Sequence, residues 1–398
     1  MKIRDVESEQ EFPQLADMLA KAYEGDYFTY YNQFFRRIDE FPDRKLRNCR
    51  VLEVDGEVVA HVRVVPHVMH VGRARLRLGG IGAVGTDPFH GKKGYATALL
   101  HDTMDYMTRE GYDVSLLFGI TNFYPRFGYA NCTPYFNCTL ELAALPSAPS
   151  GLRVRKFRPA DLPAVVKLHK QHAMSMVGAM ERSEAYFRYE RNRWGNYLLV
   201  TERGKAIGYV EVTGGPKPWV VEVALPERAD AYALVLAECG KRARAGLTRE
   251  VGVGLPPSHP FGQYCQSLGA RFSVTYRRDG GAMGRLMNVD AWARKMCPEW
   301  SARLAASEFK DFTGALEIEC DLGAVTLAIS DGKVTIGDQS AKRKVKADQR
   351  VFAQFTFGYR TVEAARLAGE LDASAANAKL LAALFPEQQA VVWPSDHF

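Results

Sequence analysis

The residues with the clearest chemical potential lie between Val84 and Thr97, where a strand-like run gives way to a helical pattern. The first N–H groups of a helix have no partner within it, and the helix dipole adds a partial positive charge there. Lys92 and Lys93 add formal charge, and Gly94 lets a ligand come close to the backbone. The pattern predicts a site for a pyrophosphate, although a basic turn entering an ordinary helix would read the same way. The Walker A and dinucleotide-binding glycine patterns are absent from this turn.

The order of strand, [Gln/Arg]-x-x-Gly-x-[Gly/Ala], helix and buried strand resembles the acetyl-CoA signature of the GNAT acetyltransferase superfamily. Gly94 and Ala96 match its small residues, whereas Gly91 stands where Gln or Arg is expected, so Lys92 or Lys93 would supply the missing charge. The resemblance implies that acetyl-CoA is the co-substrate and that no metal takes part. The implied acetyl-CoA ligands are Ala83, Val84, Gly85, Thr86, Gly91, Lys92, Lys93, Gly94, Tyr95, Ala96 and Thr97.

The strand that precedes this turn is unusually rich in glycine. In the GNAT family a bulge splays this strand, and its backbone bonds the pantetheine arm; here the strand is residues 81–86. So many glycines weaken a strand, and they make sense where a ligand approaches the backbone. The glycines are Gly79, Gly80, Gly82 and Gly85.

Tyr124 lies in residues 119–129, which resemble the Tyr-x-Arg-Phe-Gly-Tyr element that follows the fifth strand of these acetyltransferases. The resemblance gives Tyr124 the role of general acid, because a phenol can protonate the thiolate that leaves when an amine attacks a thioester. Aromatic packing is the alternative for Tyr124 and the preferred interpretation for Phe127 and Tyr129.

Periodicity predicts the elements that must position these residues. In the first segment they are a short strand at 3–6, a helix at 12–23, a hairpin at 50–65, a strand at 74–78, a helix from Ala96 that Gly111 ends, and a buried strand at 114–120. A second copy begins near Gly151 after a Pro/Ser-rich linker, with its own hairpin at 197–212 but without the acetyl-CoA motif. The last segment has predicted strands at 316–320, 325–329 and 333–336 and helices at 361–371 and 375–385.

Residues 355–360, 384–386 and 393–398 resemble the sterol-carrier-like ending of the Eis family, named for enhanced intracellular survival, whose members acetylate aminoglycosides. The predicted fold class is therefore α/β (α+β): two tandem GNAT folds with mixed, mostly antiparallel sheets and flanking helices, and an α+β sterol-carrier-like domain. We expect a catalytic domain at 1–145, a degenerate GNAT domain at 146–286 and the sterol-carrier-like domain at 287–398.

The Eis resemblance also implies a general base and a substrate pocket. The base is the α-carboxylate of Phe398, which would take the proton of an ammonium group, with Asp396 and His397 beside it. A polycationic amine calls for acidic and aromatic residues, and the family places a pocket wall at the end of the first helix. The candidates there are Glu24, Asp26, Tyr27 and Phe28, for which a solvated loop with packed aromatics is the alternative.

Composition limits the functional classes. The 398 residues carry a net charge of +6, and the charge run at 342–346 is short, so we read it as a solvated strand or loop and expect no nucleic-acid partner. The seven scattered cysteines suit a reducing cytoplasm, and no apolar run suggests a membrane partner. We expect a cytoplasmic homo-oligomer, by family resemblance a trimer or hexamer, that acts on a small-molecule amine. A lipid or acyl-CoA carrier and a protein-lysine acetyltransferase are the alternatives.

Overall fold

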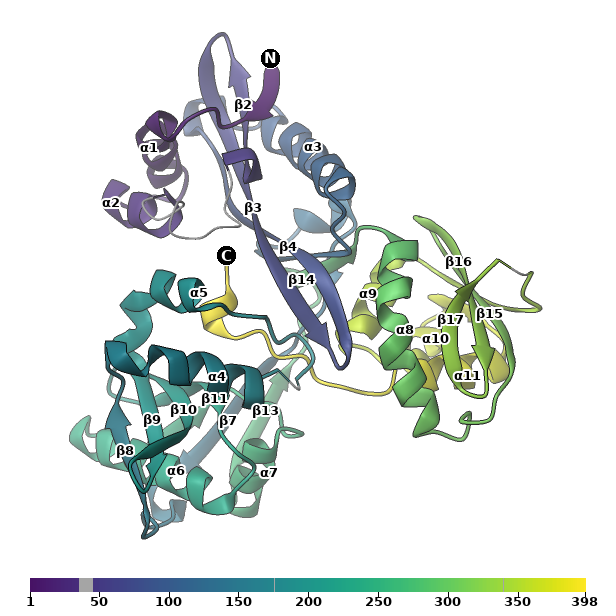
Figure 1. Ribbon diagram of the computed structural model, residues 1–398. Helices are drawn as coiled ribbons and strands as arrows, with labels where there is room; N and C mark the ends of the chain where they lie inside the picture. The colour runs from purple at the N-terminus through teal and green to yellow at the C-terminus, as the bar shows by residue number, and fades with distance from the viewer. Residues whose placement is uncertain (36–45, 175, 339) are drawn as a thin grey trace. The chain divides into compact units, whose positions relative to one another are not determined.

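The computed structural model describes residues 1–35, 46–174, 176–338 and 340–398 (Figure 1). The chain divides into two compact units. Unit 1 comprises Met1–Cys132, Arg278–Gln388 and Phe398, and unit 2 comprises Thr133–Arg277 and Gln389–His397. Within the described residues, no helix combines the length and the apolar character needed to cross a bilayer.

Unit 1 contains a seven-stranded sheet with the order β1-β2-β3-β4-β5-β14-β6. Its strands are β1 (Lys2–Asp5), β2 (Cys49–Val54), β3 (Glu57–Val71), β4 (Ala74–Thr86), β5 (Val114–Gly119), β14 (Gly281–Leu286) and β6 (Ala130–Asn131). Only the β4/β5 pair is parallel among the pairs described in this sheet, because α3 crosses over between these two strands.

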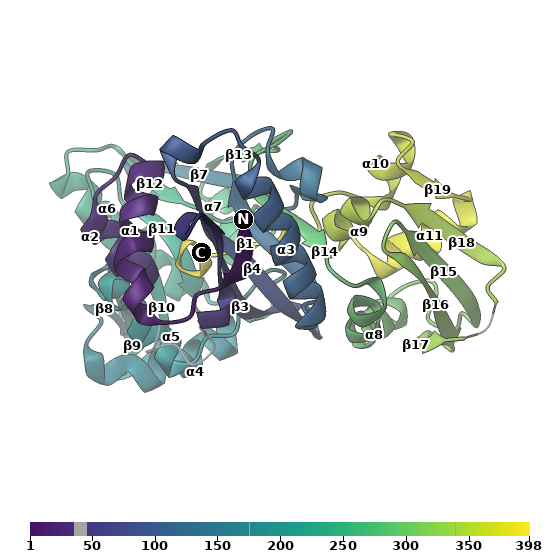
Figure 2. The ribbon, with the colours of Figure 1, turned by 90° about the horizontal axis from the view of Figure 1, so that it is seen from above.

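Two long helices flank this sheet, α1 (Phe12–Ala22) on one face and α3 (Tyr95–Arg109) on the other (Figures 1 and 2). Each helix buries one apolar stripe, Leu15 and Leu19 on α1 and Leu99 and Met107 on α3. A short helix, α2 (Tyr27–Tyr30), follows α1. The sheet is thereby covered on both sides, and the end of β4 leads directly to the start of α3.

Unit 1 also contains a five-stranded sheet with the order β17-β16-β15-β18-β19. Its strands are β15 (Gly314–Cys320), β16 (Gly323–Ser330), β17 (Lys333–Gly337), β18 (Arg343–Ala347) and β19 (Leu371–Ala373), and its helices are α8 (Val289–Ala305), α9 (Gln349–Thr356), α10 (Val362–Leu367) and α11 (Ala375–Leu384). Gln349 joins this part to the first sheet: its side chain accepts from Leu286 N at 2.8 Å and donates to Gly128 O at 2.6 Å.

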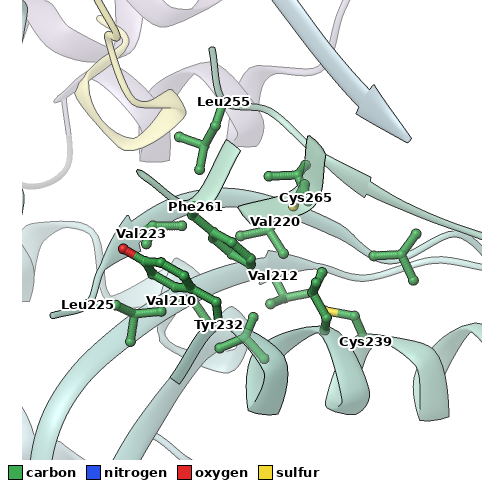
Figure 3. Packing of buried hydrophobic residues seen from close by; sticks show 14 of the residues in the cluster. Val210, Val212, Val220, Val223, Leu225, Tyr232, Cys239, Leu255, Phe261 and Cys265 are labelled. Carbon is green, nitrogen blue, oxygen red and sulfur yellow. The ribbon is translucent and has the colours of Figure 1, made fainter. Parts of the chain in front are cut away.

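Unit 2 has a second seven-stranded sheet, with the order β13-β7-β12-β11-β10-β9-β8. Its strands are β7 (Tyr135–Glu141), β8 (Leu152–Lys156), β9 (Tyr197–Glu202), β10 (Lys205–Thr213), β11 (Trp219–Ala224), β12 (Glu250–Val253) and β13 (Arg271–Thr275), and its helices are α4 (Leu162–His172), α5 (Glu184–Tyr189), α6 (Ala229–Ala245) and α7 (Pro260–Ser267). Figure 3 shows its apolar core, in which Tyr232 stacks on Phe261 with ring centroids 4.8 Å apart.

Residues 389–397 are bound tightly within unit 2. Trp393 is fully buried in the core of this unit. The buried guanidinium of Arg182 donates to both carboxylate oxygens of Asp396 at 2.7 Å and to Glu222 at 2.7 Å. Ser395 joins the same cluster by donating to Glu222 at 2.7 Å. Asp396 is therefore engaged by Arg182, so the sequence expectation that it lies beside the Phe398 carboxylate as a tuning group gains no support.

The predicted fold class is confirmed, because each of the three sheets is mixed and mostly antiparallel and has flanking helices. The domain boundaries at 145 and 286 stay predictions, but the sheets do not follow them. β7 precedes residue 145 and belongs to the sheet of unit 2, whereas β14 precedes residue 286 and pairs with β5. The two segments have exchanged one strand.

Two local predictions can be compared directly with the structure. The charge run at 342–346 falls largely in strand β18, as expected, and its exposed Lys344 and Lys346 pair with Glu317 and Glu319 of β15. The helix predicted at 361–371 is wrong at its end: α10 stops at Leu367, and β19 begins at Leu371. Gly369, with φ of +72°, turns the chain out of the helix.

Candidate active site

Strands β4 and β5 part at a bulge in β4. Their parallel pairing runs from Leu78↔Val114 to Ile81↔Leu117 and ends there, although both strands continue. On the other side of β4, the register with β3 shifts between His61 and Arg63. Ala83 lies in the bulge with a left-handed φ of +49°. The bulge expected in residues 81–86 is therefore present, and it opens β4 away from β5.

The glycines of β4 serve two different purposes. A Cβ on Gly79 would lie 2.5 Å from Met107 Sδ of α3, and a Cβ on Gly85 would lie 2.5 Å from Leu19 of α1. These two glycines make room for the flanking helices, so the ligand explanation is wrong for them. Gly80 and Gly82 instead face Phe398, as described below.

The turn before α3 is open and electropositive. Residues 91–94, which include Lys92 and Lys93, are exposed, and a Cβ on Gly94 would meet no atom within 4 Å. Gly94 is the N-cap of α3, with φ of +82°, and it supplies no side-chain hydrogen bond to the first turn. The unpaired N–H groups of that turn, the helix dipole and the two lysines all favour an anion. These residues fit the diphosphate of a coenzyme.

The remaining predicted coenzyme residues lie on either side of this turn. Ala83, Val84, Gly85 and Thr86 form the end of β4 after its pairing with β5 has stopped. Tyr95, Ala96 and Thr97 form the first turn of α3 and are partly exposed. The predicted residues thus form one continuous path from the bulge to the helix start.

Tyr124 begins a short 3-10 helix, Tyr124–Phe127, directly after β5. Its ring packs edge-on against Phe123 and Tyr129, with centroids 5.0 and 6.3 Å away, and only 8% of the residue is exposed. A Cβ on Gly119 would meet this ring at 2.3 Å, so the last residue of β5 must be small. Burial raises the pKa of Tyr124 to about 12. The phenol is therefore fully protonated at neutral pH and available as a proton donor.

Phe398 lies against the bulged part of β4. A Cβ on Gly80 would lie 2.4 Å from the ring of Phe398, and a Cβ on Gly82 would lie 2.7 Å from its carboxyl carbon. The ring also contacts Phe118 of β5 at a centroid distance of 5.7 Å. Phe398 thus touches the residue before Gly119, and Gly119 touches Tyr124. Both predicted catalytic residues meet the same end of β5.

The four predicted substrate residues lie at the end of α1 and in α2. Asp26 is the N-cap of α2: one carboxylate oxygen accepts from Thr29 N at 3.0 Å and the other from the Thr29 hydroxyl, and these bonds lower the pKa of Asp26. Phe28 is 71% exposed, Glu24 is also exposed, and Tyr27 stacks on Tyr31. Among the described residues, no hydrogen bond, ion pair or ring contact joins these four to Tyr124 or Phe398.

Two residues at the bulge were missed by the sequence interpretation. His61 Nδ1 lies 2.8 Å from Ala83 O, and the Tyr23 hydroxyl donates to Val84 O at 2.6 Å. Burial and the nearby phenol of Tyr124 hold the pKa of Tyr23 above its ordinary value. Neither residue belongs to a motif, since Tyr23 reads as part of a helix face and His61 as one residue of a strand.

Comparison with known proteins agrees with this geometry. Residues 2–132 match the acetyltransferase (GNAT) domain family, and residues 315–393 match the sterol carrier protein domain family. No curated protein matches the sequence significantly.

Solved structures share the fold over nearly the full chain. A GCN5-related N-acetyltransferase from Anabaena variabilis is 17% identical, with a TM-score of 0.78 over 100% of both chains. One from Kribbella flavida is 19% identical, with a TM-score of 0.74 over 100% of this chain and 98% of that one. Eis1 from Mycobacterium abscessus is 17% identical, with a TM-score of 0.70 over 100% of both chains. The chain is therefore a GNAT N-acetyltransferase that carries a sterol carrier protein domain, and its fold is that of Eis1.

Proposed function

We propose that this enzyme moves an acetyl group from acetyl-CoA to a primary amine of a small polycationic molecule, such as an aminoglycoside or a polyamine. One observation carries the proposal. The bulge that opens β4 away from β5 lies between an exposed basic helix start and the end of β5, where Tyr124 and Phe398 meet. Direct attack needs a proton donor, a proton acceptor and a thioester site close together.

The coenzyme would be held by two parts of one path. The exposed turn at 91–94 and the first turn of α3 suit the diphosphate, and residues 83–86 suit the pantetheine arm, because their edge of β4 is free of β5. When bound, acetyl-CoA supplies the acetyl group as an activated thioester.

Tyr124 and Phe398 would move the two protons that the reaction requires. An amine with a pKa of about 10 is mostly protonated at neutral pH, so the carboxylate of Phe398 accepts a proton from the acceptor ammonium group, directly or through water. The hydroxyl of Tyr124 donates its proton to the departing sulfur, and burial keeps that hydroxyl protonated.

The acceptor would be held by Glu24, Asp26, Tyr27 and Phe28. Each oxygen of Asp26 keeps a second lone pair after its bond to Thr29, so the carboxylate can still pair with an ammonium group. The exposed ring of Phe28 offers a cation–π surface.

Thiol release from acetyl-CoA in the presence of kanamycin or spermidine tests the acceptor. We expect amine-dependent release. Acetylation of a lysine peptide alone would identify a protein-lysine acetyltransferase, and tight lipid binding without any release would identify a carrier function of the sterol carrier protein domain.

A peptide tag fused after Phe398 tests the base, with the same tag at the N-terminus as the control. We expect the C-terminal tag to abolish turnover while coenzyme A still binds. Full activity of the C-terminally tagged enzyme would rule out the Phe398 carboxylate as the base.

A further inference from the structure

The bulge in β4 needs to be held in place. Ala83 has a φ of +49°, and the left-handed region is unfavourable for a residue with a Cβ. Such conformations persist where surrounding groups fix them, and they concentrate at functional sites. The groups that fix Ala83 therefore bear on the site itself.

Two side chains bind the two successive carbonyl groups of the bulge. The oxygen of Ala83 can only accept, so His61 carries its hydrogen on Nδ1 and donates it over 2.8 Å. The Tyr23 hydroxyl donates to the next carbonyl, Val84 O, at 2.6 Å. The two donors come from different elements, β3 and the end of α1.

Packing alone does not explain His61. The residue is 0% exposed and contacts the ring of Phe35 edge-on at 5.6 Å. Its Nε2 has no hydrogen-bond partner among the described residues, a costly arrangement that an apolar side chain would avoid. The one hydrogen bond that the ring makes is to the bulge.

We infer that His61 and Tyr23 are positioning residues that hold the β4 bulge in the conformation that acetyl-CoA binds, an inference that rests on the proposed function. The peptide group is planar and trans, so fixing the carbonyl of Ala83 toward His61 turns the N–H of Val84 in the opposite direction. Tyr23 fixes the following peptide group in the same way. The backbone groups that would meet the pantetheine arm are therefore oriented before the coenzyme arrives.

Four variants separate this role from a general effect on folding. His61→Leu removes the donor, whereas His61→Asn keeps an N–H close to the place of Nδ1. Tyr23→Phe removes only the second donor. Val51→Ala is the matched control, because Val51 is fully buried beside His61 on β2 and makes no contact with the bulge carbonyls. For each variant we would measure the Kd for coenzyme A by calorimetry, KM for both substrates, kcat and Tm.

We expect His61→Leu to raise the Kd for coenzyme A and KM for acetyl-CoA about tenfold, with KM for the amine unchanged. His61→Asn should return both within about threefold of the wild type, and Tyr23→Phe should raise them about fivefold. The two losses should combine to less than their product, because both act on one element. Val51→Ala should lower Tm and leave the Kd unchanged.

Two results would overturn the inference while the proposed function stands: wild-type Kd and KM in His61→Leu, or a folded His61→Asn that binds as weakly as His61→Leu. A wild-type protein that fails to bind coenzyme A would instead overturn the proposed function, and this inference with it.

Discussion

Tyr124 owes its suitability as an acid to its surroundings. Three aromatic neighbours and the close approach of Gly119 bury the phenol, and burial raises its pKa to about 12. Tyr124→Phe should therefore lower kcat by about 10²- to 10⁴-fold and leave the Kd for coenzyme A unchanged.

Tyr129→Phe is the control for that experiment. Tyr129 is also a buried phenol, but its hydroxyl bonds Ser115 at 2.7 Å within the core. Its loss should cost about 1 kcal/mol of unfolding free energy and little of kcat. Equal kcat values for the two variants would remove Tyr124 from the mechanism.

His61 should also make the fold sensitive to acid. Burial lowers its pKa from 6.5 to about 4 in the folded protein, so the unfolded chain binds more protons between these values. Stability is thus complete above pH 6.5 and falls as the pH drops toward 4. Between pH 7 and pH 4.5 the wild type should lose about 2–3 kcal/mol more unfolding free energy than His61→Asn. Urea unfolding at both pH values measures this difference, and equal losses would contradict it.

At the level of elements, the start of α3 should govern coenzyme affinity. Lys92 and Lys93 are exposed beside an uncapped helix start, so their attraction for a diphosphate is electrostatic and screened by salt. Lys92→Ala/Lys93→Ala should raise the Kd for coenzyme A about tenfold at low salt and by less at 0.5 M NaCl. Lys205→Ala, an exposed lysine of unit 2, should have no effect. A Kd in the double variant that matches the wild type at low salt would exclude this site.

Elements defined by local pattern could be predicted, and those defined by distant pairing could not. The hairpin at 50–65, the helix after Gly94 and the bulge each have a signal within a few residues, and they match β2–β3, α3 and β4. The strand exchange of β7 and β14 has none, because neither strand differs in composition from one that stays in its own sheet. Tyr23 and His61 were missed for the same reason: their partners lie 61 and 22 residues away.

At the scale of the molecule, the sterol carrier protein part and the first sheet should unfold together. Both belong to unit 1, and Gln349 bonds Leu286 N and Gly128 O while almost fully buried. Gln349→Ala leaves both backbone groups without that partner and should lower the unfolding free energy of unit 1 by about 2–4 kcal/mol. Urea unfolding tests this, with the exposed Arg350→Ala as the control, expected to stay within about 0.5 kcal/mol of the wild type. A Gln349→Ala loss no larger than the control would show that the two parts unfold independently.

The strand exchange has a consequence for synthesis on the ribosome. The edge of β5 gains its partner β14 only after residue 286 has left the exit tunnel, whereas β7 is made before nearly all of the sheet that receives it. Throughout that interval the nascent chain presents an unpaired edge of apolar residues, including Val114, Leu116 and Leu117. Translation speed and chaperone supply across residues 120–286 should therefore limit the yield of soluble enzyme more than the stability of the finished fold.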